Sequence, residues 1–229
     1  MKWGVVRFAG SLDDNDAVYA LREVLGQDAA LLWHKDERLD GVGCVVLPGG
    51  FSYGDYLRCG AIARFSPIMK SVARFAADGG LVIGICNGFQ ILCEAHLLPG
   101  ALTRNRSLSF ICERVAVRVD NADTPFTSAA RAGEVLRLPI KHGEGCYVAP
   151  EDELRQMEER GQVLLRYVDA DGVERDEANP NGSMHGIAGV ANEHFNVFGL
   201  MPHPEHAVEK MLGGDDGLKI FRSIIESAR

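Results

Sequence analysis

A short apolar run that leads into a glycine-flanked cysteine constrains the fold of this chain more than any other feature. Residues 81–85 are continuously apolar and predict a buried strand, and residues 87–95 predict a helix. Between them, Gly84-Ile85-Cys86-Asn87-Gly88 matches the nucleophile elbow G-x-S-x-G, with cysteine in place of serine. Such a turn lifts one side chain out of a sheet, and the flanking glycines leave room for the neighbouring backbone. The chain is therefore expected to contain a sheet whose strands alternate with helices.

The rest of the first half shows the same alternation. Apolar runs predict strands, and helical periodicity predicts the helices between them. The predicted strands are residues 4–9, 29–33, 44–47 and 81–85, and the predicted helices are residues 13–25, 60–77 and 87–95. Because strands buried on both faces are continuously apolar, the predicted fold is α/β, with an open, mainly parallel sheet flanked by helices.

The second half has a different pattern. Residues 110–119 alternate, with Val115, Val117 and Val119 on one face of a predicted strand and Arg114 on the other. Further predicted strands are 135–140, 163–168, 187–190 and 197–200, and further predicted helices are 150–159 and 217–228. No repeat or linker separates the halves. We therefore expect residues 1–229 to form a single domain in which an antiparallel extension continues the parallel part.

Composition excludes several classes of protein. The 229 residues carry a net charge of -8 without a basic run, so nucleic acid is not an expected partner. No segment has the length and apolar character of a membrane span, and the N-terminus has no signal-peptide pattern. The cysteines show no zinc-ligand spacing, which predicts free thiols in a reducing cytoplasm and no metal site. They are Cys44, Cys59, Cys86, Cys93, Cys112 and Cys146.

Cys86 is the candidate nucleophile. At the start of a helix its thiolate form is favoured by the helix dipole, and the N–H of Asn87 is free to bind a developing oxyanion. A buried structural cysteine beside a tight turn is the alternative, which the elbow pattern alone leaves open. For Cys44 and Cys93 the structural interpretation is the preferred one.

The segment Met201-Pro202-His203-Pro204-Glu205-His206 follows a predicted strand and supplies a candidate base. A cysteine hydrolase needs an imidazole to activate the thiol and to protonate the leaving group. His203 and Glu205 are two residues apart, so an extended backbone places both side chains on the same side, where the carboxylate orients the ring. His206 is a competing candidate. The alternative for the segment is a polar loop with a solvated histidine.

A third candidate segment, Pro48-Gly49-Gly50-Phe51, lies at the end of another predicted strand. Backbone N–H groups near Gly50 and Phe51 are suited to bind an anion or oxyanion. A nucleotide site is not expected here, because the chain has no GxxxxGK[ST] motif. An ordinary loop is the alternative. Together the three segments predict an oxyanion hole, a nucleophile and a base dyad.

Residues 84–90 resemble the nucleophile motif of class I (triad-type) glutamine amidotransferases, and Pro202-His203-Pro204-Glu205 resembles their His-x-Glu motif. Four further segments resemble the glutaminase subunits of phosphoribosylformylglycinamidine synthases, so the resemblance covers nearly the whole chain. They are residues 48–55, 104–107, 141–145 and 179–183. Cys146 departs from the pattern, since a basic residue is expected after His142-Gly143-Glu144-Gly145.

The resemblance implies a flavodoxin-like fold and a division of labour between subunits. This chain would hydrolyse L-glutamine to glutamate and ammonia with Cys86, His203 and Glu205. A partner synthetase, joined to it by a small bridging subunit, would use ATP and Mg²⁺ to convert formylglycinamide ribonucleotide to formylglycinamidine ribonucleotide in purine biosynthesis. No cofactor is then expected on this chain.

The resemblance also points to residues that would contact the glutamine backbone groups, namely Gln90, His142, Gly143 and Glu144. An interface loop facing the synthetase is the alternative for residues 142–145. Two other functions stay open at this point. One is a stand-alone cysteine hydrolase of similar fold, and the other is a catalytically silent regulatory or binding module.

Overall fold

A nine-stranded sheet organises the computed structural model of this chain, which describes residues 1–228. Its strand order is β2-β1-β3-β4-β11-β10-β9-β6-β7, and β5 and β8 form a separate two-stranded sheet. The strands are β1 Lys2–Arg7, β2 Asp28–Trp33, β3 Cys44–Leu47, β4 Leu81–Ile85, β5 Ala101–Thr103, β6 Ile111–Val119, β7 Val135–His142, β8 Cys146–Val148, β9 Val163–Val168, β10 Ile187–Ala191 and β11 Val197–Leu200.

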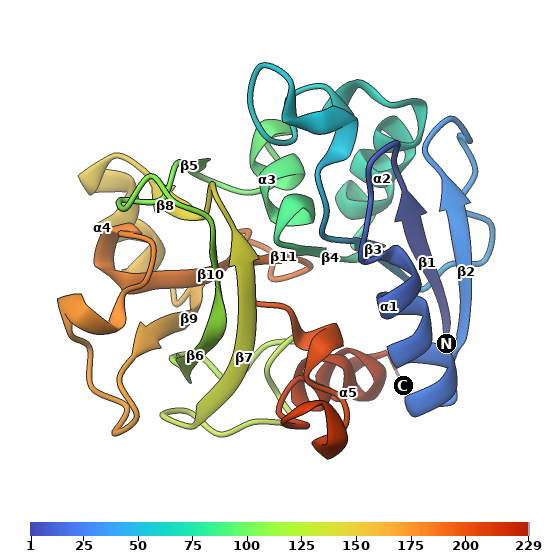
Figure 1. Cartoon of the computed structure of the whole chain (residues 1–229). Helices are drawn as coiled ribbons and strands as arrows, with labels where there is room; N and C mark the ends of the chain where they lie inside the picture. The colour runs from blue at the N-terminus through green and yellow to red at the C-terminus, as the bar shows by residue number, and fades with distance from the viewer. Residues whose placement is uncertain (229) are drawn as a thin grey trace.

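Strands β2, β1, β3, β4 and β11 are parallel and form the covered half of the sheet. Helices α2 and α3 lie on one side of this half, and α1 and α5 lie on the other (Figure 1). Trp3 on β1 packs edge-on against Phe221 of α5, with ring centroids 6.2 Å apart. The helices are α1 Asp14–Tyr19, α2 Pro67–Ala77, α3 Asn87–Glu94, α4 Glu151–Glu159 and α5 Leu218–Ser227. The predicted mainly parallel sheet with flanking helices is confirmed.

The antiparallel extension continues the same sheet. Strand β10 runs antiparallel to both β11 and β9, and β6 runs antiparallel to β9 and β7. The alternation predicted for β6 is present, because Val115, Val117 and Val119 are buried while Arg114 is exposed. The small β5–β8 sheet was not predicted, since each of its strands has only three residues.

The predicted helix over residues 60–77 is wrong in its first part. Helix α2 begins at Pro67, and Ser66 before it is extended, with φ -59° and ψ 141°. Proline disfavours helical backbone in the residue that precedes it, so the segment before Ser66 forms only a short 3₁₀ turn, Ala63–Phe65. The first strand is also two residues earlier than predicted, at Lys2–Arg7 rather than 4–9. The helix predicted over 13–25 is α1 followed by a π-helical turn, Ala20–Val24.

All six cysteines are free thiols, as predicted. Among residues 1–228, no helix is both long enough and apolar enough to cross a membrane.

Candidate active site

Cys86 occupies a sharp turn between β4 and α3. Its backbone has φ 50° and ψ -104°, a conformation that costs a non-glycine residue about 1–3 kcal/mol. The turn is possible because Gly88 has no side chain: a Cβ there would lie 1.9 Å from the carbonyl oxygen of Leu47. A Cβ on Gly84 would similarly collide with Gly88. The predicted nucleophile elbow is therefore present, and Cys86 lies at the carboxyl end of the parallel sheet.

His203 reaches the same place because its strand is the neighbour of β4. Strands β4 and β11 are parallel, with Leu200 paired to Ile85, and the N–H of Cys86 donates to the carbonyl of Leu200 at 2.8 Å. The chain leaves β11 beside the elbow. His203 is fully buried there, and its Nδ1 donates to Oε1 of buried Glu205 at 2.6 Å. The predicted contact between the imidazole and the carboxylate is confirmed.

The electrostatics of His203 favour an imidazolium. Burial by itself lowers the pKa of His203, but the Glu205 carboxylate and the neighbouring Cys86 raise it to about 10. Nε2, the ring nitrogen that is not bonded to Glu205, has no hydrogen-bond partner of regular geometry within residues 1–228. In enzymes without substrate, catalytic hydrogen bonds are often loose and tighten only in the complex. The arrangement suits a thiolate–imidazolium pair oriented by a carboxylate.

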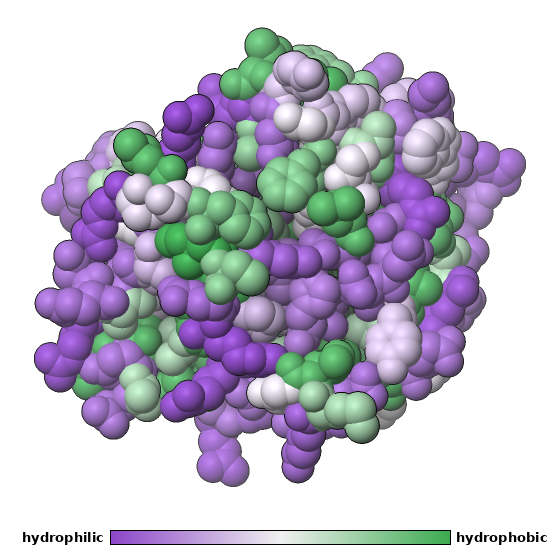
Figure 2. Space-filling model, in the orientation of Figure 1, coloured by the Kyte–Doolittle hydropathy of each residue, from purple (hydrophilic) through white to green (hydrophobic). Residues whose placement is uncertain are grey.

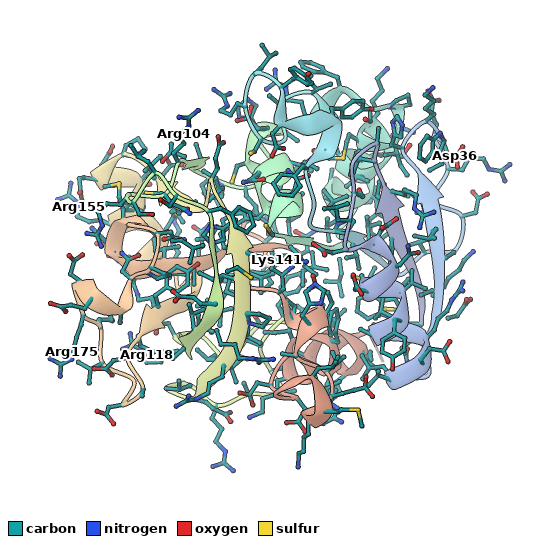
Figure 3. The ribbon with its side chains drawn as sticks, in the orientation of Figure 1. Asp36, Arg104, Arg118, Lys141, Arg155 and Arg175 are labelled. Carbon is teal, nitrogen blue, oxygen red and sulfur yellow. The ribbon has the colours of Figure 1, made fainter. Side chains whose placement is uncertain are left out.

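Asp13, which the sequence analysis did not identify as a site residue, lies next to this pair and contacts His203. Its carboxylate is buried and lies 3.7 Å from Nδ1 of His203, 3.3 Å from Nε2 of His206, and in a salt bridge with Lys141. Lys141 lies on β7, near the centre of the molecule in Figure 3. Burial would raise the pKa of Asp13, but its three cationic or hydrogen-bonding partners hold it well below the usual range.

His206, the competing candidate base, lies beside Asp13 and is hydrogen-bonded to it. Asp13, His203, Glu205 and His206 have ligand atoms within 4.8 Å of one another, a grouping that the predicted absence of a metal site did not foresee. Within this group, Asp13 already pairs with Lys141, and Glu205 pairs with Nδ1 of His203. Nothing in the sequence indicated Asp13, because its partners are distant in the chain. Asp13 follows β1, whereas Lys141 lies on β7, at the other end of the strand order.

The two predicted oxyanion donors, the backbone N–H groups of residues 50 and 51, differ in whether they are free to bind a substrate. The N–H of Phe51 donates to the carbonyl of Gly10 at 2.9 Å, so it is unavailable to a substrate. No backbone acceptor within residues 1–228 takes the N–H of Gly50 or Asn87. Gly50 has φ 140°, and a Cβ there would lie 2.6 Å from the backbone nitrogen of Leu12. Of the predicted donors, Gly50 and Asn87 therefore remain suited to the role.

A cavity of about 180 Å³ opens at Cys86. This volume is below the ~300–1,000 Å³ of sites for drug-sized ligands and suits a small metabolite. Its walls carry every predicted glutamine-contacting residue and several others. They are Gly50, Phe51, Asp55, Cys59, Cys86, Gln90, Phe110, Lys141, His142, Gly143 and Glu144. A larger cavity of about 790 Å³, between the end of α3 and α4, contains none of the triad.

Gln90 and His142 have mainly supporting contacts. The Gln90 amide accepts from Asn87 Nδ2 at 2.8 Å and donates to the carbonyl of Glu144 at 2.5 Å. His142 is buried, and its Nδ1 is hydrogen-bonded to Asn105 Oδ1 at 3.0 Å. Burial, with a smaller contribution from His203, lowers the pKa of His142 to about 4, so the ring is neutral at pH 7. Both side chains shape the cavity around Glu144.

Two buried asparagines hold the turn that carries Gly143 and Glu144. Asn105 donates to the carbonyl of His142 at 2.8 Å and accepts from the N–H of Gly145 at 3.0 Å. Asn181 donates to the carbonyl of Gly145 at 2.8 Å. Segments 104–107 and 179–183 thus converge on segment 141–145. Cys146, the departure from the expected pattern, donates its thiol to the carbonyl of Gly182 at 3.1 Å.

Comparison with known proteins agrees with this geometry. Residues 2–214 match the model of the CobB/CobQ-like glutamine amidotransferase domain. The chain belongs to this glutamine amidotransferase family.

Other members are similar over their full length. This glutamine amidotransferase is 60% identical to the phosphoribosylformylglycinamidine synthase subunit PurQ of Salinibacter ruber, over 98% of this chain and 95% of that one. It is 57% identical to the same-named subunit of Gloeobacter violaceus, over 100% and 98% of the two chains. A chain in the structure of PurLQS from Thermotoga maritima superposes with a TM-score of 0.89 and 47% identity, covering 100% of this chain and 99% of that one.

Proposed function

We propose that this chain is the glutaminase subunit of a phosphoribosylformylglycinamidine synthase. The observation that carries the proposal is Cys86 in the wall of a small cavity, next to the buried His203–Glu205 pair, in a chain 60% identical over nearly its full length to a subunit of that name. A stand-alone cysteine hydrolase and a silent binding module are not favoured, because the likeness extends over the whole length and the triad is intact.

The geometry supports hydrolysis of the glutamine side-chain amide. The Cys86 thiolate attacks the carboxamide carbon, and the N–H groups of Gly50 and Asn87 stabilise the oxyanion. One such donor contributes about 10²–10³ in turnover. His203 protonates the departing ammonia and then accepts a proton from the water that hydrolyses the thioester. Glu205 fixes the tautomer of His203 and stabilises its imidazolium, as the carboxylate does in serine-protease triads.

The ammonia is used by a partner synthetase, held with this chain and a small bridging subunit in a cytoplasmic complex. ATP and Mg²⁺ belong to the synthetase in this scheme. The rim of the cavity is suited to a protein contact, since Phe51 and Phe110 are 43% and 55% exposed and lie 6.3 Å apart. Apolar surface gathers near the upper ends of β6 and β7 (Figure 2). We propose a single glutamine amidotransferase domain over residues 1–229, which is supported by the adjacency, in one sheet, of β4 and β11, the strands that precede Cys86 and His203.

Replacement of Cys86 by Ala tests the proposal. In the reconstituted complex, C86A is expected to abolish glutamine-dependent synthesis of formylglycinamidine ribonucleotide, while ammonium-dependent synthesis continues at the wild-type rate. Normal glutaminase activity in C86A would overturn the assignment. Full-rate glutamine hydrolysis by the isolated chain, unchanged when the synthetase is added, would instead support a stand-alone hydrolase.

A further inference from the structure

Asp13 turns its carboxylate toward His203 instead of capping the helix that follows it. It is the N-cap residue of α1, a position where aspartate commonly accepts a hydrogen bond from the first turn. Within residues 1–228 its side chain makes no such bond to the helix. The buried carboxylate instead lies 3.7 Å from Nδ1 of His203. A residue type that suits helix capping is therefore used here for a contact with the catalytic base.

The surrounding backbone leaves room for this contact. A Cβ on Gly49 would lie 2.3 Å from Oδ2 of Asp13 and 2.7 Å from Cε1 of His203. The carbonyl of Gly49 also accepts from the N–H of Asp13 at 3.2 Å, which ties the two residues together. The turn Pro204–His206, next to His203, contacts both α1 and β7 and lies between them (Figure 1). A side chain at position 49 would therefore displace Asp13 or His203.

Two further residues hold the Asp13 carboxylate in place. Lys141 on β7 forms a salt bridge with Oδ1, and Nε2 of His206 lies 3.3 Å from the same oxygen. The other oxygen, Oδ2, faces His203. Burial by itself raises the pKa of Asp13, but these contacts lower it well below the usual range, so the carboxylate is ionised at neutral pH. Lys141 thus fixes Asp13 while its second oxygen stays directed at the base.

Several elements contribute titratable groups around His203. They are Cys86 at the elbow, His142 on β7, Glu205 and His206 on its own segment, Asp13 before α1 and, behind Asp13, Lys141. The two carboxylates, Asp13 and Glu205, both lie near Nδ1 of the ring. An opposite charge within about 4–6 Å favours the charged form of a group, and the charge of His203 is one of those that lower the pKa of Asp13. Since an interaction between two charges acts on both, Asp13 also favours the imidazolium form of His203.

We propose that Asp13 is a second positioning carboxylate for the catalytic base, which holds the Nδ1 side of the His203 ring together with Glu205 and is itself fixed by Lys141. Because this role presupposes that His203 serves Cys86, it rests on the proposed function. Asp13 acts through His203, and it is not part of the wall of the cavity that opens at Cys86. A salt bridge that only stabilises the fold is the alternative. In that case, loss of Asp13 and loss of Lys141 have the same effect, whereas a positioning role gives opposite effects on His203.

The test is a histidine titration followed by NMR in the isolated full-length chain, with the His203 signals assigned from H203N. D13N removes the charge and keeps a good N-cap residue at the start of α1. We expect D13N to lower the pKa of His203 by about 1–2 units, the effect of one opposite charge at this distance. K141M should leave this pKa unchanged or raise it, because a positive charge is lost. D14N is the matched control, since Asp14 is also buried and forms a salt bridge, but with Arg7, and it should not change the titration.

Kinetics of the reconstituted complex add a second readout. D13N should lower kcat for glutamine about 10-fold at neutral pH, the counterpart of one pKa unit, with a smaller change in KM and unchanged ammonium-dependent synthesis. D13S, which also keeps a good N-cap residue, replaces D13N if that variant does not fold. An unchanged His203 titration in the folded variant, or an equal fall in D13N and K141M, would overturn the inference. Failure of the proposed function gives a different result, because the wild-type complex would then show no glutamine-dependent synthesis while the titration still moves in D13N.

Discussion

The carboxylate of Glu205 offers a quantitative test of the triad. In E205Q the side chain keeps its shape and loses its charge, at a site where it lies 2.6 Å from Nδ1 of a fully buried His203. The pKa of His203 is raised from 6.5 to about 10 by Glu205 and Cys86 together, against the opposing effect of burial. The direction of this shift means that the two neighbouring groups stabilise the imidazolium form of His203 more than burial destabilises it.

E205Q removes a charge-assisted hydrogen bond to the His203 imidazolium, which typically contributes about 1.5–3 kcal/mol, so kcat/KM for glutamine should fall about 10- to 150-fold. The pKa of His203 should fall in E205Q, because the Glu205 carboxylate that raises it is lost, while Cys86 and Asp13 remain. C86A, by contrast, removes the nucleophile and should leave no measurable activity.

The assay is glutamine-dependent synthesis by the reconstituted complex between pH 6 and 9, with ammonium-dependent synthesis as the control for the synthetase. A thermal unfolding curve for E205Q separates lost activity from lost structure. A loss in E205Q as complete as that in C86A, in a folded protein, would refute the orienting role. So would a loss smaller than about 3-fold.

Three further variants test the surrounding structure. G88A should lower the free energy of unfolding in urea by about 3 kcal/mol or more, because its Cβ would lie 1.9 Å from a backbone oxygen, whereas G143A, whose Cβ meets only a ring atom 3.8 Å away, should change it little. D13N should cost about 1–3 kcal/mol at pH 7. Because the pKa of Asp13 is lowered from 3.8, its charge stabilises the fold above about pH 4, so the difference between D13N and wild type should narrow as the pH falls further. N105A should raise the KM for glutamine about 10-fold or more, since the turn bearing Glu144 loses two hydrogen bonds.

The sequence predicted the triad residues of the site, but it did not predict all of the residues that surround them. Cys86, His203 and Glu205 could be predicted because the patterns that identify them are local. A nucleophile elbow needs glycines at fixed spacing, and a His-x-Glu segment needs only two residues of extended chain. The adjacency of β4 and β11, which brings His203 next to Cys86, is a feature of the strand order that no local pattern predicts.

Asp13 and Asp55 could not be predicted in the same way. Asp13 reaches His203 only through the sheet order, which places β1 and β11 on either side of β3 and β4. Asp55 reaches the cavity through left-handed backbone at three non-glycine residues, a conformation that sequence propensity argues against. The predicted start of α2 was wrong for a related reason. The restriction that Pro67 places on the backbone of Ser66 outweighed the helical periodicity of the preceding residues.

The triad depends on the insertion of β11 more than on any single side chain. Strand β11 lies between β4, with which it is parallel, and β10, with which it is antiparallel, so it joins the two halves of the sheet. Gly199 on this strand packs so closely under Phe89 of α3 that a Cβ there would lie 2.1 Å from the ring. This contact joins the elbow helix α3 to the strand that leads to His203. The nucleophile and its base are therefore brought together by the packing that completes the core, and a chain in which β11 is displaced has neither a continuous sheet nor an active site.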